Sequence, residues 1–325
     1  RFHIGALDIE TDILVSDIPA EQPINVITYI DDKTLQGYTV FTKNENYKGQ
    51  DKIIEDLEGF KRKVKEVFIR TCDDINIAED RNKFSALLDK LNVEQPAWKE
   101  LTSFESAKEF SNSIGYPVLI RPSYVLSGSA MSVAFDENEL ERYLKKAKTF
   151  SKDKSAIITK FIEDAKEIEF DGVSSNGELI CYAIGEHIEN AGVHSGDATI
   201  ILPAQRINLQ TFREIRLIAR RISKALKITG PFNIQFIAKD NKIKVIELNL
   251  RASRTFPFVS KTYGLNFIDL ATKAMLGEDV NRVDKSLFEK DYVCVKAPQF
   301  SFSRLKKADP ILSVEMVSTG EVACF

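Results

Sequence analysis

The sequence predicts an α+β protein with mostly antiparallel sheets, preceded by a shorter segment of different character. Apolar runs of strand length and amphipathic helical patterns both occur, but they do not follow a strict strand–helix–strand rhythm. The 325 residues are enough for about two domains. An apolar content of 43% and a charged content of 29% are ordinary for a globular protein with a sizeable core.

The first elements expected are strands at 24–30 and 37–42, then a charged helix within 51–69. Beyond Cys72 the elements become denser and better punctuated. Four helices are predicted there. The first has Phe84, Leu87, Leu88 and Leu91 on one face, and the second is opened by Thr102 and Glu105 and stopped by Gly115. The third is opened by Asp136 and Glu139, and the fourth is opened by Thr211 and Glu214 and ended by Gly230–Pro231. The predicted strands are 117–121, 131–135, 156–161, 167–173, 179–184, 232–238 and 242–250.

Charge, hydropathy and cysteine spacing exclude several classes of protein. The 45 basic and 48 acidic residues leave a net charge of −3, which does not indicate nucleic-acid binding. No stretch approaches the ~18 apolar residues of a membrane span and no signal peptide follows Arg1, so we expect no membrane partner and a cytoplasmic location, with the mitochondrion as the alternative. The four cysteines and three histidines lack disulfide-scaffold or zinc spacing, which indicates free thiols.

The strand at 242–250 places Glu247 and Asn249 on one face. A three-residue loop at 240–242 would set Gln235, on the preceding strand, opposite Glu247. A two-residue loop would instead pair Gln235 with Ile246 and turn Glu247 away. The sequence alone leaves both registers open, together with an ordinary hairpin that has a solvated polar face.

In the first register, one carboxylate and two amide oxygens lie on the same face. Hard cations such as Mg²⁺ take such oxygen ligands and share them with substrate phosphates. Arg251 and Arg254 follow directly and can hold anionic groups in fork geometry.

Two further segments are candidates for binding. The small residues Ser127 to Ala130 join two predicted strands and can turn backbone N–H groups toward phosphate, although a plain turn has the same composition. Residues 186–197 hold two histidines, three carboxylates and two glycines, which is typical of a loop that binds cations or a ribose, although an exposed loop with incidental histidines is the alternative.

These three segments, in this order, resemble the second, carbamate-phosphorylating ATP-grasp domain of carbamoyl phosphate synthetase. The motifs that carry the resemblance are RPSYVLSGSAM, HIENAGVHSGDA, FNIQFIAKDN, IELNLRASRTFPFVSK and KAPQFSFSRLKKADPILSVEMVSTGEV. PFVSK is similar to the second half of that enzyme, and SGSAM and FSFSRL are similar to its eukaryotic branch. The resemblance covers 71–325 and implies an ATP-grasp fold with two α+β lobes that clamp ATP: a small lobe at about 118–195, a large lobe at about 196–280 and an extension at 281–325.

The resemblance also implies a role for each matching residue. At the nucleotide phosphates, the resemblance implies Arg81 and Arg121, together with the loop Ser127 to Met131, in which Met131 lies against the adenine. It implies Lys160, Ile162 and Glu167 at the adenine and ribose. It implies that Gly192, Val193, His194 and Ser195 line the nucleotide cleft. The residues implied to bind cations are Gln235, Glu247 and Asn249 for Mg²⁺ or Mn²⁺, and His187 and Glu189 for a monovalent cation such as K⁺. Arg251 would stabilise the transferring γ-phosphoryl group, and Arg254 would bind the acceptor.

The reaction implied is phosphoryl transfer from ATP to carbamate, which gives carbamoyl phosphate and ADP for pyrimidine, arginine or urea synthesis. The implied partners are ATP, carbamate or bicarbonate, and the other carbamoyl phosphate synthetase parts: the first synthetase half, the glutaminase and the regulatory domain. The start at Arg1 and the stop at Phe325 are interpreted as cuts through a larger multifunctional protein, or as a join between two proteins. A non-catalytic ATP-binding fragment and a biotin carboxylase-like enzyme are the alternatives.

Residues 1–70 are expected to form an incomplete α/β segment and resemble another family. Leu7-Asp-Ile-Glu-Thr11 is similar to the first exonuclease motif of family B DNA polymerases, and 21–42 is similar to the strands that follow it. Asp8 and Glu10 share one face of a strand, and paired carboxylates can hold two metals for phosphodiester hydrolysis. A metal-dependent 3′–5′ exonuclease remnant is therefore a further hypothesis, beside that of two exposed acidic residues on an edge strand.

Overall fold

Strands form in both apolar runs of the N-terminal segment. β1 (Ile27–Ile30) and β2 (Gly37–Val40) pair antiparallel, with Tyr29 opposite Tyr38. The computed structural model describes residues 27–30, 37–40, 77–78, 80–122, 131–150, 156–240, 242–283, 290–301, 312–314 and 316–325. Asp8, Glu10, the helix expected within 51–69 and the loop from Ser127 to Ala130 lie outside these residues. The chain divides into two compact units, Arg1–Asp73 and Asp74–Phe325.

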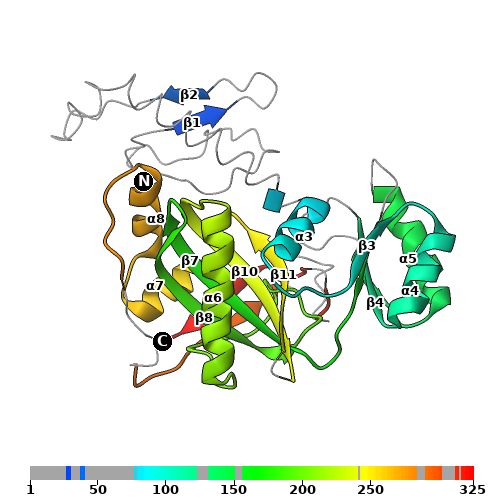
Figure 1. The fold of residues 1–325 in the computed structure, drawn as a ribbon. Helices are drawn as coiled ribbons and strands as arrows, with labels where there is room; N and C mark the ends of the chain where they lie inside the picture. Colours follow the sequence, from blue (N-terminus) through cyan, green and yellow to red (C-terminus); the bar gives the residue numbers. More distant parts are fainter. Residues whose placement is uncertain are drawn as a thin grey trace. The chain divides into compact units, whose positions relative to one another are not determined.

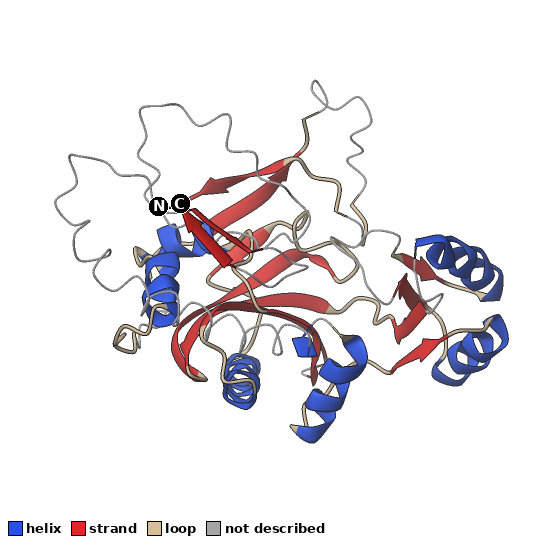
Figure 2. Cartoon of the chain, turned by 90° about the horizontal axis from the view of Figure 1, so that it is seen from above, coloured by secondary structure: helices blue, strands red, loops and turns tan. Residues whose placement is uncertain are grey.

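The second unit contains two antiparallel sheets. The smaller one has the strand order β3 (Trp98–Leu101), β6 (Ala156–Lys160), β4 (Val118–Pro122) and β5 (Ser132–Ala134). Helices α4 (Phe104–Ile114) and α5 (Glu137–Phe150) lie side by side on one face of it (Figures 1 and 2). Val118, Ile120, Leu140 and Leu144 are buried between the helices and the sheet.

The larger sheet has seven strands, and helices pack against both of its faces. Its order is β11 (Lys242–Asn249), β10 (Gly230–Lys239), β7 (Lys166–Ser175), β8 (Glu178–Asn190), β9 (Ile200–Leu202), β12 (Cys294–Gln299) and β13 (Gly320–Cys324). Helix α6 (Leu209–Ala225) packs across one face (Figure 1), near α3 (Arg81–Lys90). Helices α7 (Phe256–Tyr263) and α8 (Phe267–Met275) cover part of the opposite face.

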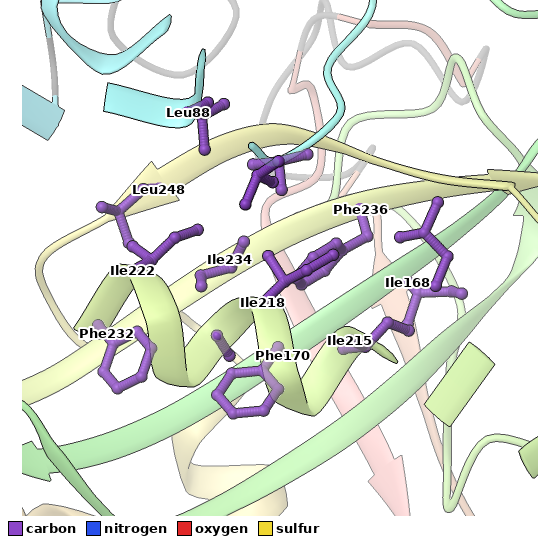
Figure 3. Packing of buried hydrophobic residues seen from close by; sticks show 14 of the residues in the cluster. Leu88, Ile168, Phe170, Ile215, Ile218, Ile222, Phe232, Ile234, Phe236 and Leu248 are labelled. Carbon is purple, nitrogen blue, oxygen red and sulfur yellow. The ribbon is translucent and has the colours of Figure 1, made fainter. Parts of the chain in front are cut away.

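The main core lies between α6 and strands β7, β10 and β11. Figure 3 shows Ile215, Ile218 and Ile222 of α6 against the aromatic rings of Phe170 and Phe232. Those two rings are 5.8 Å apart, and Phe170 also stacks on Tyr182 of β8 at 5.4 Å. Because side chains alternate along a strand, the residues between these core positions face the other side of the sheet. None of the helices that the structure describes is long and apolar enough to cross a membrane.

The strands group differently from the lobe limits expected from the sequence. β7 and β8 fall within the expected small lobe, yet they form the middle of the seven-stranded sheet. β3 and α4 precede residue 118 and belong with the smaller sheet, and β12 and β13 of the expected extension join the larger one. The physical reason is burial: the apolar face of β7 is covered by α6, which packs on the larger sheet.

Three helix ends also differ from the expectation. α4 begins after Ser103, whose Oγ accepts the N–H of Ser106 at 3.2 Å, so Ser103 and not Thr102 is the N-cap. α6 begins after Asn208, whose Oδ1 accepts the N–H of Thr211 at 2.8 Å. Its C-cap is Leu226, and Gly230–Pro231 opens β10 instead of ending the helix.

Other helix-end predictions are confirmed. Gly115 is the C-cap of α4, with φ +77°. Asp136 and Glu139 open α5 as expected, because Asp136 Oδ1 accepts the N–H of Glu139 at 2.8 Å. The carboxylate of Glu139 in turn accepts the N–H of Phe135 at 3.0 Å.

Replacing Ser103 by alanine tests the corrected start of α4. The change removes the acceptor for an orphan N–H of the first turn, so we expect Ser103→Ala to lower the free energy of unfolding by about 1 kcal/mol. Thr102→Ala is the matched control and should change it by only a few tenths. Urea unfolding followed by circular dichroism measures both, and a larger loss for Thr102→Ala would restore the capping box predicted from the sequence.

Candidate functional site

The pairing of β10 with β11 brings Gln235 opposite Glu247, as one of the two predicted registers requires. The hairpin reaches this pairing by another route than the predicted three-residue loop. Lys239 pairs with Lys242, which leaves two residues in the loop. A β-bulge then takes up one residue of β11, Ile246, which has no partner in the register.

The bulge changes which face the later residues of β11 occupy. Ile243 and Val245, before the bulge, and Leu248, after it, all pack in the core under α6. Without the bulge, Leu248 would face away from the core, and Glu247 and Asn249 would face into it. Arg81, from α3, donates from Nη1 to the carbonyl oxygen of Ile246, so the bulged peptide has a partner outside the ladder.

Two rows of polar side chains cross strands β7, β10 and β11 as a result. Each row consists of residues that are direct cross-strand partners on the face opposite α6. The first row is Glu169, Gln235 and Glu247, and the second row is Asp171, Asn233 and Asn249. The rows therefore bring together the three predicted metal ligands, Gln235, Glu247 and Asn249. The β7 end of each row is a buried carboxylate, Glu169 or Asp171.

Hydrogen bonds connect the second row. Nδ2 of Asn233 donates to Oδ1 of Asp171 at 2.9 Å, and Nδ2 of Asn249 points toward Oδ1 of Asn233 at 3.5 Å. At the open end of the row, Nη2 of Arg251 lies 3.3 Å from Oδ1 of Asn249. Ser253, in the turn that follows, donates to the same carboxylate oxygen of Asp171 at 2.7 Å.

The first row reaches the segment that holds Gly192, Val193, His194 and Ser195. Nε2 of Gln235 donates to Oγ of Ser195 at 2.9 Å. Gly192 has φ +118°, a backbone conformation that favours glycine. The expected polar loop is shorter than 186–197, because 186–190 form the end of β8.

The loop from 191 to 199 is attached to the C-terminal residues of the chain. The N–H of His194 donates to the carbonyl of Ser313 at 2.7 Å. The buried carboxylate of Asp197 accepts the N–H groups of Val317 at 2.8 Å and Ser318 at 3.1 Å. Arg254 contacts the same segment, with Nη1 3.0 Å from Sδ of Met316.

Glu167, Glu169 and Asp171 occupy every second position of β7, so three buried carboxylates lie on one face of this strand. Burial raises the pKa of Glu167 to about 7, and Glu169 and Glu247 add to that rise while His187 opposes it. Burial and the charge of Glu169 raise the pKa of Asp171 to about 7. Burial would also raise the pKa of Glu169, but His187, whose Nε2 lies 3.3 Å away, lowers it below its ordinary value.

Lys296 of β12 supplies a buried positive charge to this group. Its side chain is 1% exposed, and its ammonium lies 3.2 Å from the carboxylate of Glu321. Its charge lowers the pKa of both Glu169 and Asp171. A buried carboxylate needs such compensation because the transfer of a charge out of water is costly.

Arg81, Arg121 and Glu247 also influence one another electrostatically, although they come from α3, β4 and β11. Burial, helped by the charge of Arg121, lowers the pKa of Arg81 to about 9, and Glu247 opposes the change. Burial likewise lowers the pKa of Arg121, again against the effect of Glu247. Two guanidinium groups of the same sign beside one carboxylate leave excess positive charge for an anion.

The remaining predicted residues have other surroundings. Nζ of Lys160 donates to the carbonyls of Gly115 and Tyr116, both at 2.9 Å. Ile162 lines a pocket of about 160 Å³ with Ala165, Ile237, Lys239, Asp240, Lys242 and Lys244. Met131 is half-buried. Glu189 accepts the N–H of Thr199 at 2.8 Å.

Some residues of the site were not predicted from the sequence. They are Glu169, Asp171, Asn233, Ser253, Thr255 and Lys296. The strand Glu167-Ile-Glu-Phe-Asp171 alternates acidic and apolar residues, and this pattern is the signal that could have identified the acidic face of β7. No cluster of three or more His, Cys, Asp or Glu suited to a metal occurs in the described part of the chain, so the candidate ligand set depends on amide oxygens.

The two antiparallel sheets, and the rows of polar residues on the larger one, define an ATP-grasp protein. Solved structures share this fold. Biotin carboxylase from Campylobacter jejuni, in a β,γ-ATP complex, has a TM-score of 0.61 at 19% identity over 70% of this chain and 52% of that chain. N5-carboxyaminoimidazole synthase from Aspergillus clavatus has a TM-score of 0.62 at 13% identity over 77% of this chain and 69% of that chain.

Within this class, the chain belongs to the family described as carbamoyl-phosphate synthase L chain, ATP binding domain, which matches residues 80–283. The match includes every candidate residue from Arg81 to Arg254. Multifunctional protein URA2 of Saccharomyces cerevisiae is 58% identical over 253 residues, which are 78% of this chain and 11% of that protein. The mitochondrial carbamoyl-phosphate synthase (ammonia) of Rattus norvegicus is 54% identical over 77% of this chain and 17% of that protein. The chain therefore spans only a small part of these relatives.

The raised pKa of Glu167 predicts how stability depends on pH. A carboxyl whose pKa rises on folding, here from 4.5 to about 7, stabilises the folded state fully below pH 4.5, and this contribution is lost as the pH rises through about 7. Without divalent cations, the free energy of unfolding should therefore fall between pH 4.5 and 7, and less steeply in Glu167→Gln. Glu178→Gln, at an exposed position of β8, is the control. Equal slopes for Glu167→Gln and the wild type would contradict the assignment.

Proposed function

We propose that this chain transfers the γ-phosphoryl group of ATP to carbamate, giving carbamoyl phosphate and ADP. The observation that carries the proposal is the pair of polar rows, which set one carboxylate and two amide oxygens beside two arginines. The names of the relatives support carbamate as the acceptor. Residues 71–325 are proposed as the ATP-grasp domain, and 1–70 as a separate segment.

The donor set fits Mg²⁺ or Mn²⁺. Gln235 and Asn249 each use the amide nitrogen for a protein hydrogen bond, which leaves the Gln235 oxygen, and the second lone pair of the Asn249 oxygen that Arg251 approaches, for a cation beside the Glu247 carboxylate. We infer that these three residues hold the metal. When bound, the metal would neutralise charge on the β- and γ-phosphates.

The arginines contribute positive charge where the phosphoryl group is transferred. We propose that Arg81 and Arg121 hold the nucleotide phosphates and that Arg251, next to Asn249, stabilises charge on the transferring group. Arg254 would bind the carbamate, an anion, and so align it with the γ-phosphorus. Fixed positive groups of this kind are most of what phosphoryl transfer requires from a protein.

We assign the nucleotide to the side of the sheet that carries these rows. We propose that Ser195, held by Gln235, and the neighbouring residues of its loop line the nucleotide cleft, with Ile162, Lys160 and Met131 at the adenine. Glu167 would bind the ribose. A monovalent cation such as K⁺ is proposed beside Glu189 and the buried His187, whose Nδ1 has no hydrogen-bond partner among the described residues.

The relatives support a proposal about the wider setting. We propose that the chain works with the first synthetase half, the glutaminase and the regulatory domain of a larger synthetase, and that it acts in the cytoplasm. We propose pyrimidine or arginine synthesis as its pathway, and one relative is an arginine-specific large chain.

The reverse reaction gives the simplest test. The purified chain, supplied with MgADP and carbamoyl phosphate, should form ATP, which luciferase detects. Glu247→Gln should reduce the rate about 100-fold or more, because it removes the carboxylate ligand. Glu178→Gln, an exposed change of the same kind, should leave the rate unchanged.

Two outcomes would contradict this proposal. ATP formation that survives Glu247→Gln would overturn the metal assignment. Nucleotide binding without any ATP formation by the wild-type chain would favour the non-catalytic ATP-binding fragment.

A further inference from the structure

We propose that Asp171 is a positioning residue that holds the metal-facing amide of Asn249 and the arginine-bearing turn 251–254 in one arrangement. The proposal rests on the proposed function, because it assigns Asp171 a role at the metal and phosphoryl positions. Asp171 is 2% exposed and lies on β7, two strands away from Asn249. It acts through other residues and touches neither metal nor substrate.

The orientation of Asn233 is the first step. Oδ1 of Asp171 lies 2.9 Å from one end of the Asn233 amide. The same oxygen takes the hydroxyl of Ser253, and it accepts hydrogen bonds whether or not Oδ2 carries a proton, so that end must be the NH₂ group. The Asn233 oxygen is thereby turned toward β11.

The orientation of Asn249 follows from that of Asn233. The Asn233 oxygen can only accept, so it takes the NH₂ end of Asn249, at 3.5 Å. Oδ1 of Asn249 then faces the open side of the row, where Nη2 of Arg251 lies 3.3 Å away. If Asn249 were flipped, its NH₂ group would face the cation, which it cannot ligate. The carboxylate thus selects the flip of an amide two strands away.

The same carboxylate oxygen also holds the turn after β11. Oγ of Ser253 donates to it at 2.7 Å and accepts the N–H of Thr255 at 3.1 Å. Ser253 lies between Arg251 and Arg254, so its attachment restricts where both guanidinium groups can go. Thr255 donates to the neighbouring carboxylate Glu169 at 3.2 Å, which adds a second anchor.

Burial makes the arrangement hard to replace. Asp171, Asn233 and Thr255 are each 3% exposed or less, so solvent cannot readily substitute for a missing acceptor. Residues behind metal ligands typically change metal affinity by about 10- to 100-fold when removed. A purely structural role would lower stability without affecting the metal.

The test compares ADP binding with and without Mn²⁺. Isothermal titration gives the dissociation constant of ADP in EDTA and in saturating Mn²⁺. The first value divided by the second is the ratio that measures the contribution of the metal. Asp171→Leu, which has no acceptor, should lower that ratio about 10- to 100-fold relative to the wild type. Asp171→Asn can still present an oxygen to Asn233 and Ser253, so it should retain the ratio within about threefold.

Two further variants keep the test decisive if Asp171→Leu does not fold. Asn233→Ala breaks the same chain one step later and should lower the ratio in the same way. Ser223→Ala is the control: it removes a buried hydroxyl bonded to Ser174 at 2.8 Å on the α6 side, so it should lower stability but leave the ratio unchanged.

The outcomes separate this proposal from the proposed function. A ratio unchanged in Asp171→Leu, or in Asn233→Ala if the first variant does not fold, would overturn the positioning role. An equal loss of ADP affinity with and without Mn²⁺ would do the same. A wild-type chain that binds ADP more tightly with Mn²⁺ but forms no ATP would contradict the proposed reaction, while the role of Asp171 would still be decided by the ratio.

Discussion

The β-bulge at Ile246 determines which side chains the larger sheet turns toward the candidate site. Side chains alternate along a strand, so without the extra residue the pairing would put Ile246 opposite Gln235 and turn Glu247 into the core. With it, the apolar residues of β11 stay under α6 on both sides of the bulge. The hydrogen bond from Arg81 to the bulged carbonyl connects this local irregularity to one of the arginines assigned to the phosphates.

Strand β7 has an apolar face and a polar face, and both are buried. Ile168 and Phe170 lie in the core with α6, while Glu167, Glu169 and Asp171 are buried on the opposite face. Three carboxylates in so little space are tolerable because each has a compensating group. Lys296 supplies positive charge, Nε2 of His187 lies 3.3 Å from Glu169, two of the carboxyls have pKa values near 7, and the polar neighbours Asn233, Ser253 and Thr255 donate hydrogen bonds. The carboxylates on this face are therefore compensated by hydrogen bonds and by positive charge.

Local patterns predicted the strands between 117 and 250 apart from β9 and the class of fold, because alternation and turn residues act over a few positions, and they left the pairing of Gln235 with Glu247 as one of two registers. They did not predict how that pairing arises, since a bulge and a longer loop have the same effect on register. The N-cap of α4 was missed by one residue because Thr102 and Ser103 have equivalent hydroxyls, and only the backbone selects between them. The contributions of Asp171 and Lys296 depend on strands that are distant in sequence, and nothing in either local segment specifies that neighbour.

The attachment of the 191–199 loop to residues 313–318 has a consequence for the order in which the protein acquires its structure. During synthesis from the N-terminus, the sheet from β7 to β11 can pair before the later strands exist. Gln235 of β10 can bond to Ser195 early, but the backbone donors that Asp197 receives among the described residues, Val317 and Ser318, leave the ribosome more than a hundred residues after the loop itself. A nascent chain would thus hold a formed core and a loop attached at one end only, and the final placement of His194 and Ser195 would be among the last properties to mature.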